Sequence, residues 1–242
     1  MVFNSYSFIL IFLPLCVAVF HLLKRTKNPV FPKVFLLCAS LFFYGLHNKE
    51  ALAVLCISTV INYVISLFCR EDSASKQQRR SPKMRKALLI LGISLDILAL
   101  LYCKYLLFFE DLCNTWFGTD FTYQALILPL GISFYTFSQI AYLVDSYRDG
   151  TKCGFTDYAL FVTFFPKITV GPIALSSEMV PQFNRAAAEK LSADSFAKGL
   201  TALSFGIAKK VLLADTLAKY ADWGYANTGV LGTTNALIVL VA

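Results

Sequence analysis

Two apolar segments of this chain are interrupted by helix-breaking residues, and they constrain the fold more than any other feature. The first covers residues 128–137 (LPLGISFYTF) and the second residues 164–173 (FFPKITVGPI). The interruptions are Pro129, Gly131, Pro166, Gly171 and Pro172. In lipid an unsatisfied backbone group is costly, so broken helices persist at membrane depth only inside protein or beside a cavity. Two such segments close together predict a site or a path built within a bilayer.

The composition is typical of an integral membrane protein. Of the 242 residues, 57% are hydrophobic and 15% are charged, whereas a soluble domain carries about 25% charged residues. Two short loops beside apolar stretches carry more than the whole net charge of +7, with +4 in residues 24–33 and +5 in residues 70–86. This is the positive-inside pattern of cytoplasmic loops. We therefore expect the chain to associate with a lipid bilayer and not with nucleic acid.

Four transmembrane helices are predicted, over residues 6–23, 34–46, 51–69 and 87–109. The second is short for a span of about 20 residues, so it tilts little or begins as early as Phe31. With the basic loops on the cytoplasmic side, the turn 47–50 and the acidic loop 110–124 lie outside. The same assignment places the N-terminus outside.

The second half of the chain is less regular. A fifth span is expected over residues 125–144, followed by a re-entrant or buried broken segment over residues 158–175. Residues 192–222 carry apolar side chains at every third or fourth position between lysines, which predicts an amphipathic helix broken near Gly206. That helix is expected against the cytoplasmic surface or neighbouring helices. A last apolar run over residues 235–242 stops after a few residues, so a C-terminal truncation is expected.

These patterns predict an all-α polytopic membrane protein. Several transmembrane helices combine in it with broken or re-entrant segments and amphipathic interfacial segments. No stretch between the spans is long enough to fold as a soluble domain. Residues 1–242 are therefore interpreted as part of a single membrane-embedded domain.

Two charged residues lie inside the fourth predicted span. Asp96 is deep in it, and a charge at a helix centre costs about 2.5–3.5 kcal/mol on insertion scales, so a polar partner or a cavity is expected. Lys104 follows about 12 Å along the same helix, too far for a direct pair. Lys104 is close enough to the outer end to extend its amine to the interface. It stays a candidate for lining a substrate path.

The fifth span carries a stripe of small and polar residues. Gly131, Tyr135, Ser138, Tyr142 and Asp145 are spaced by four, three, four and three residues, which places them on one helical face. Such a face is used in ordinary helix packing in membranes and equally in the lining of a cavity. Both readings remain open for this stripe, and an Asp145–Arg148 pair is interpreted as a surface tether.

Lys167 is the most suggestive single charge, because it lies between Pro166 and Gly171 in interrupted backbone. A cation there could meet an anionic ligand such as the phosphates of a coenzyme A donor. A lysine at a cytoplasmic interface explains the position equally well.

No catalytic or metal site is evident in the residues alone. The only histidines, His21 and His47, have no nearby carboxylate or nucleophile in the sequence, and the seven cysteines contain no CxxC pair. GxSxG, HExxH, P-loop and GxGxxG motifs are absent. No catalytic residue, metal or bound cofactor is therefore predicted within this chain.

Several motifs, in order along the chain, resemble those of a known family. They are residues 2–6 (VFNSY), 103–105 (CKY), 128–137 (LPLGISFYTF), 142–148 (YLVDSYR), 157–166 (DYALFVTFFP), 171–173 (GPI) and 206–215 (GIAKKVLLAD). With them the chain resembles the N-terminal half of the bacterial membrane-bound O-acyltransferases (MBOAT), in the alginate O-acetyltransferase-like branch. Matches in one register along nearly the whole chain are more specific than any single motif.

The resemblance implies a function and a location. Family members enclose a tunnel that brings an acyl donor, such as acetyl-CoA, from the cytoplasm to an acceptor outside. The implied reaction transfers an acyl group, acetyl in the first instance, to hydroxyls of an extracytoplasmic polysaccharide or cell-wall polymer, directly or through an acyl-relay protein. The implied location is the bacterial cytoplasmic membrane.

The resemblance also implies a missing part. The family's essential histidine follows a motif for which this chain has no counterpart, so His21 and His47 do not correspond to it. The chain is expected to be inactive alone, and the candidates for lining the tunnel are Asp96, Lys104, Tyr135, Ser138, Tyr142, Asp145 and Lys167.

Two other functions remain as alternatives. A transporter or flippase-like carrier also uses discontinuous helices near the midplane, but the chain shows no inverted repeat. A non-enzymatic membrane scaffold that recruits partners through the basic loops leaves the interrupted segments unexplained. Acyl transfer from a labelled donor separates the enzyme from both, and substrate flux into vesicles identifies the carrier.

Overall fold

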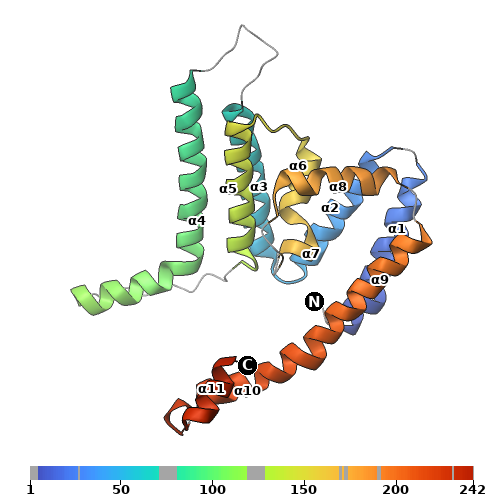
Figure 1. The fold of residues 1–242 in the computed structure, drawn as a ribbon. Helices are drawn as coiled ribbons and strands as arrows, with labels where there is room; N and C mark the ends of the chain where they lie inside the picture. Colours follow the sequence, from blue (N-terminus) through green and yellow to red (C-terminus); the bar gives the residue numbers. More distant parts are fainter. Residues whose placement is uncertain are drawn as a thin grey trace. The chain divides into compact units, whose positions relative to one another are not determined.

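The computed structural model of the chain describes residues 5–26, 28–70, 81–118, 129–168, 171, 174–189, 192–230 and 232–241. Within these ranges the regular elements are all helices and no strand occurs (Figure 1). The described residues therefore confirm the predicted all-α class. The chain divides into two compact units, Pro14–Glu189 and a second unit made of residues 2–13 and 190–242. Each unit is described by itself.

The first unit holds eight successive helices in its described part. They are α1 (Leu13–Lys24), α2 (Val30–Gly45), α3 (Lys49–Cys69), α4 (Pro82–Phe117), α5 (Ile132–Arg148), α6 (Phe155–Thr163), α7 (Phe165–Ile168) and α8 (Ser176–Ala188). Helix α5 packs against both α3 and α4, and α3 also packs against α4. Helix α6 packs against α2, α3 and α8 (Figure 1). The core of the unit lies where α2, α3, α5 and α6 meet.

Close packing of α4 depends on a glycine. A Cβ at Gly92 would lie 2.9 Å from the Leu143 Cδ1 atom of α5 and 3.2 Å from the Ile65 Cγ2 atom of α3. Small residues at helix contacts let backbones approach closely, which is how helices associate where lipid removes the hydrophobic driving force. Gly92 therefore allows side chains of α3 and α5 to pack directly against the backbone of α4.

Helices α3 and α4 start at capping residues that the sequence supplies. The Asn48 side chain accepts hydrogen bonds from the backbone N–H groups of Glu50 and Ala51, and the Ser81 side chain accepts one from Met84. These bonds satisfy donors that a helix start leaves unpaired. At the other end of α4, Gly118 takes the left-handed conformation at φ 59°, which ends the helix.

The predicted boundaries needed correction at two helices. Helix α4 extends from Pro82 to Phe117, so the first residues of the predicted outer loop 110–124 are helical. Helix α5 begins at Ile132 rather than at residue 125, because Gly131 adopts the left-handed conformation at φ 71° and ends the preceding turn. Residues 71–80 of the predicted basic loop and residues 119–128 lie outside the described residues.

The broken segment predicted over residues 158–175 is confirmed as a buried one. Helix α6 ends at Thr163, and Phe164 leaves the helical conformation before the single turn of α7. Residues 158–163 of α6 and three residues of α7 (Phe165, Lys167 and Ile168) are buried, with Leu160 and Phe161 fully so, whereas Phe155 and Pro166 are exposed. Residues 169, 170, 172 and 173 of this segment lie outside the described ones.

The second unit contains a nearly continuous helix. Its elements are η1 (Phe8–Phe12), α9 (Ala193–Ala208), the π-helical η2 (Lys209–Ala214), α10 (Asp215–Ala226), η3 (Thr228–Val230) and α11 (Thr233–Val241). The break predicted near Gly206 is a π-helical stretch that begins at Lys209, so the helix changes its winding there without stopping. Helix α11 packs on α10, where Val239 meets Gly224.

In the described part of the chain, two helices are long and apolar enough to cross a membrane by length and composition. They are α3 and the stretch Pro82–Leu106 of α4. The shorter apolar helices Phe8–Lys24 and Val30–Gly45 coincide with the first two predicted spans. Apolar side chains such as Ile90, Leu98 and Phe108 remain exposed on α4. An exposed apolar surface of this kind marks a face that another protein or a membrane covers.

Candidate functional site

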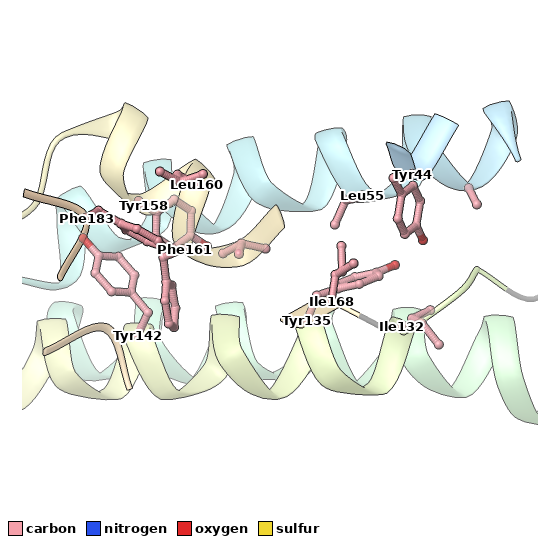
Figure 2. Close-up of a cluster of buried hydrophobic side chains, with 12 residues drawn as sticks. Tyr44, Leu55, Ile132, Tyr135, Tyr142, Tyr158, Leu160, Phe161, Ile168 and Phe183 are labelled. Atoms are coloured by element: carbon pink, nitrogen blue, oxygen red, sulfur yellow. The ribbon is translucent and has the colours of Figure 1, made fainter. Parts of the chain in front are cut away.

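The fold brings the two interrupted segments together. Ile132 and Tyr135 at the start of α5 lie in the same buried cluster as Ile168 of α7, with Tyr44 of α2 beside them (Figure 2). Figure 2 also shows a second group of the same cluster farther along α5, around Tyr142. The described residues of the two interrupted segments therefore pack together, and the expectation that they build a site or a path within a bilayer stays a prediction.

Helix α2 satisfies the backbone groups that both interruptions leave unpaired. The Phe165 N–H, which follows the break between α6 and α7, donates to the Ser40 hydroxyl at 3.2 Å. The Tyr44 hydroxyl donates to the Leu130 carbonyl at 2.8 Å, just before α5 begins. Ser40 and Tyr44 are four residues apart and therefore share one face of α2. Broken backbone can persist in an apolar core only with such partners.

Asp96 belongs to a polar cluster between α3, α4 and α5, in which Asn62 contacts both Asp96 and Gln139. The Asn62 amide donates from Nδ2 to the Asp96 Oδ1 atom at 2.7 Å and to the Gln139 Oε1 atom at 3.2 Å. Gln139 in turn donates to the Ser58 hydroxyl at 3.1 Å. Asp96, Asn62 and Gln139 are 4%, 2% and 0% exposed. These four residues are called the Asp96 cluster, and they confirm that the buried carboxyl has a polar partner.

The Asp96 cluster keeps unused hydrogen-bonding capacity. Asp96 Oδ2 and Asn62 Oδ1 are buried and have no hydrogen-bond partner among the described residues, and the same is true of the Tyr135 hydroxyl. A buried polar group without a partner is costly, so such groups usually meet water or a ligand. The cluster can therefore accept hydrogen bonds from a hydroxyl or a water molecule inside the helix core.

The residues of the predicted stripe on α5 differ in burial, and one of them lies outside the helix. Tyr135, Ser138 and Tyr142 are buried, and Asp145 is partly exposed. Gly131 precedes the helix, so it does not belong to the helical face. Ser138 donates to the carbonyl of Phe134 on its own helix at 2.9 Å, which is the ordinary packing role.

Tyr142 belongs to an aromatic group at the other end of the core. Its ring centroid lies 4.5 Å from that of Tyr158, and the Tyr158 ring lies 5.4 Å from that of Tyr63. The Cys153 thiol donates to the Tyr142 hydroxyl at 3.2 Å, and the Tyr63 hydroxyl donates to the Cys153 carbonyl. Burial raises the pKa of the Cys153 thiol above its usual value, so the neutral thiol is favoured.

Lys167 is buried in α7 at 7% exposure. Its ammonium group lies 3.9 Å from the centroid of the Phe161 ring. Within the described part of the chain its Nζ atom has no hydrogen-bond partner. The reading of Lys167 as a lysine at a solvated interface therefore does not agree with its surroundings.

Lys33 requires a correction. It was counted with the basic loop 24–33, but it lies inside α2 and is only 8% exposed. Its Nζ atom lies 2.7 Å from the Asp157 Oδ1 atom of α6 and 2.9 Å from the Asn184 Oδ1 atom of α8. Lys33 therefore connects α2, α6 and α8. Its charge is balanced by Asp157 and adds nothing to the net charge of the loop.

The remaining candidates do not join the Asp96 cluster. Lys104 is exposed on α4, with its amine 5.4 Å from the centroid of the Tyr105 ring. His21 makes a 2.8 Å hydrogen bond with the Val17 carbonyl of its own helix, and His47 lies beside the Phe43 ring. Among the described residues no group of three histidine, cysteine or acidic side chains is placed to hold a metal.

Sequence reasoning missed Asn62, Gln139, Ser40 and the Lys33–Asp157 pair. A usable signal existed for Gln139, because it lies four residues after Tyr135 and three before Tyr142, as a member of the stripe would. Asn62 is a strongly polar residue in the middle of an apolar span, which is a functional signal in membrane helices.

Comparisons with known proteins identify the chain's relatives. The chain is 37% identical over 253 aligned residues, 93% of its length, to the peptidoglycan O-acetyltransferase of Helicobacter pylori. It is 37% identical over 233 residues to the probable alginate O-acetylase AlgI of Pseudomonas aeruginosa, and 36% identical to that of Azotobacter vinelandii. No family model matches the chain. No solved structure matches it either.

The relatives are longer than this chain. The alignments cover 46%, 42% and 44% of the three relatives, so the chain spans about half the length of the curated proteins it matches. The similarity extends over 93% of the chain in each case, which agrees with the partial match expected from the motifs. The comparisons therefore agree with the resemblance to the bacterial membrane-bound O-acyltransferases, over about half the length of these relatives.

Proposed function

We propose that this chain is the N-terminal half of a membrane O-acyltransferase. The whole enzyme transfers an acyl group, acetyl in the first instance, from a cytoplasmic donor to hydroxyls of an extracytoplasmic polysaccharide or cell-wall polymer. The observation that carries the proposal is the 37% identity over 93% of the chain to a peptidoglycan O-acetyltransferase, with similar identity to alginate O-acetylases. The names of those relatives, which refer to peptidoglycan and to alginate, support the choice of a polysaccharide or cell-wall acceptor.

The proposal includes a multi-pass position in the bacterial cytoplasmic membrane, with the N-terminus outside. Support comes from the two helices long enough to span a bilayer and from the basic residues beside the apolar stretches. The exposed apolar surface of α4 faces lipid in this arrangement.

The residues of this chain contribute binding and positioning rather than the catalytic base. Acyl transfer to a hydroxyl requires a base for the hydroxyl proton, commonly a histidine. His21 is hydrogen-bonded within its own helix and His47 lies beside the Phe43 ring in the turn after α2, so neither is a member of the Asp96 cluster. The base therefore belongs to the other half of the enzyme, while Asp96, Tyr135 and Tyr142 line the path from donor to acceptor.

The function is tested by deleting the gene in its own bacterium. Peptidoglycan and exopolysaccharide are purified, and the acetate and other acids released by mild alkali are quantified. We expect ester-linked acid in one polymer to fall at least about tenfold, since enzymes accelerate such transfers by many orders of magnitude. Returning the gene should restore the ester, and a copy that stops at Ala242 should not.

Two controls make the test decisive. The mass of the protein extracted from its own membranes should exceed 27.0 kDa, the mass of this chain. Labelled acetyl-CoA supplied to membranes should label the polymer, whereas a carrier would accumulate substrate in vesicles without forming an ester. Unchanged ester content in both polymers after deletion would overturn the proposal.

A further inference from the structure

Two lysines are buried among the described residues of the first unit, and their surroundings differ. Lys33 and Lys167 are 8% and 7% exposed. The Lys33 ammonium group has a carboxylate at 2.7 Å and an amide oxygen at 2.9 Å. The Lys167 ammonium group has neither among the described residues. Lys33 is thus a buried cation whose charge and N–H donors are paired within the fold. Lys167 lacks such partners among the described residues.

An unpaired buried ammonium group opposes folding. Removing a charge from water carries a large desolvation cost, which is offset only by a close counter-charge and hydrogen bonds. The Phe161 ring 3.9 Å away supplies a cation–π contact, which replaces part of that hydration but satisfies none of the three N–H donors. The arrangement is therefore complete only when an acceptor joins Lys167.

The backbone around Lys167 holds the side chain in place. The Lys167 N–H donates to the Phe164 carbonyl at 3.0 Å, and the Gly171 N–H donates to the Lys167 carbonyl at 2.9 Å. A Cβ at Gly171 would lie 2.6 Å from Lys167 Cα and 2.7 Å from its Cγ, so only glycine allows this approach. The turn is anchored to α2 through the bond from Phe165 N–H to Ser40. Lys167 is thus held before any ligand arrives.

The chemistry of the surroundings selects an anion. Phe161, Phe165 and Ile168 beside Lys167 are 0%, 3% and 1% exposed, so the local environment is apolar. In such an environment the attraction between an ammonium group and an anion is much stronger than in water. A phosphate oxygen accepts the charged hydrogen bonds that lysine offers, and lysine is a regular phosphate ligand as a point charge.

We propose that Lys167 binds a phosphate group of the acyl donor within the helix core. This proposal rests on the proposed function, since the donor is identified through it. Lys167 is a binding residue here, and the acyl group itself is handled by the rest of the enzyme. Gly171 and Ser40 act through Lys167 as positioning residues.

The test compares Lys167→Met with Lys33→Met in the whole protein, solubilised in detergent. Methionine keeps an unbranched apolar side chain and removes the charge. Binding of coenzyme A is measured by titration and by the rise of the unfolding midpoint. We expect Lys167→Met to weaken coenzyme A binding by about 10- to 100-fold, the loss of one charged hydrogen bond.

Stability in the absence of ligand separates a binding role from a structural one. Without coenzyme A, Lys167→Met should unfold at the same temperature as the wild type or higher, because it removes an unpaired buried charge. Lys33→Met should unfold at a lower temperature, because it leaves Asp157 without its counter-charge. A fall in the unfolding midpoint of Lys167→Met as large as that of Lys33→Met would overturn the proposal.

Two further outcomes contradict the assignment. Unchanged coenzyme A affinity in Lys167→Met excludes a contact with the donor. Loss of inorganic phosphate binding alone, with coenzyme A binding intact, identifies a site for a free anion and overturns the donor assignment. If gene deletion leaves every polymer ester unchanged while Lys167→Met still abolishes coenzyme A binding, the phosphate site stands and the proposed function fails.

Discussion

Replacing Lys33 with methionine should destabilise the protein by about 3–5 kcal/mol, the usual cost of removing one partner of a buried ion pair. Asp157 would keep its charge at 17% side-chain exposure and lose its 2.7 Å partner. The contact joins α2 to α6 and, through Asn184, to α8. For a protein of this size or larger the unfolding midpoint should fall by roughly 10 °C. The midpoint is measured by thermal unfolding of the detergent-solubilised protein.

A double variant and a surface pair provide the controls. Lys33→Met combined with Asp157→Leu removes both charges and should recover most of the stability, since apolar replacements of a buried pair are often neutral. Lys198→Met breaks an exposed pair with Asp194, with the two side chains 75% and 72% exposed, and should leave the midpoint unchanged. Equal changes in the unfolding midpoint for Lys33→Met and Lys198→Met would show that the buried pair stabilises the protein no more than the exposed pair does.

Replacing Asn62 with leucine should destabilise the protein by about 3 kcal/mol, because a hydrogen bond to a charged group is lost and its acceptor stays buried. Asp96 Oδ1 and Gln139 Oε1 both lose the Asn62 amide as their donor. Asp96 Oδ2 already lacks a partner among the described residues. Since the Asp96 cluster lines the proposed donor path, ester formation on the polymer should fall as well.

The comparison variants for Asn62 lie on the same pair of helices. Asn62→Leu with Asp96→Leu removes both partners and should be more stable than Asn62→Leu alone, since no buried carboxylate then remains. Ile61→Leu changes the neighbouring residue, which is 43% exposed, and should behave as the wild type. Thermal unfolding reports the stability, and the ester assay on whole cells reports the function. A double variant less stable than Asn62→Leu would contradict this account.

Some features of the site were predictable because they depend on local chemistry. Asp96 in an apolar span required a polar partner, and the structure supplies Asn62. Pro129 and Gly131 predicted an interruption before α5, and Gly131 does take the left-handed conformation there. The break beside Pro166 was predicted in the same way and separates α6 from α7. Proline and glycine act on their own backbone, so their effect is visible in the sequence.

Other features depended on contacts between distant residues. Lys33 lies at the end of the basic stretch 24–33, which also holds Lys24 and Arg25, and the sequence therefore predicted a loop residue. In the structure it pairs with Asp157, which lies 124 residues away. Nothing in the sequence marked Ser40, which accepts the hydrogen bond of Phe165 N–H from 125 residues away. The length of α4 was underestimated because acidic residues after Phe109 were read as a loop, although they continue the helix.

The sequence by itself determined the helical class and the helix interruptions beside Gly131 and Pro166, since apolar runs, proline and glycine act on their own stretch of backbone. It also carried the family resemblance, through motifs in a fixed order. Only the tertiary structure decided which polar groups meet. The rotation of each helix about its axis is set by packing at points such as Gly92 between α3, α4 and α5. That rotation turns Asn62 toward Asp96, pairs Lys33 with Asp157 and leaves Lys167 without a counter-charge in the described core.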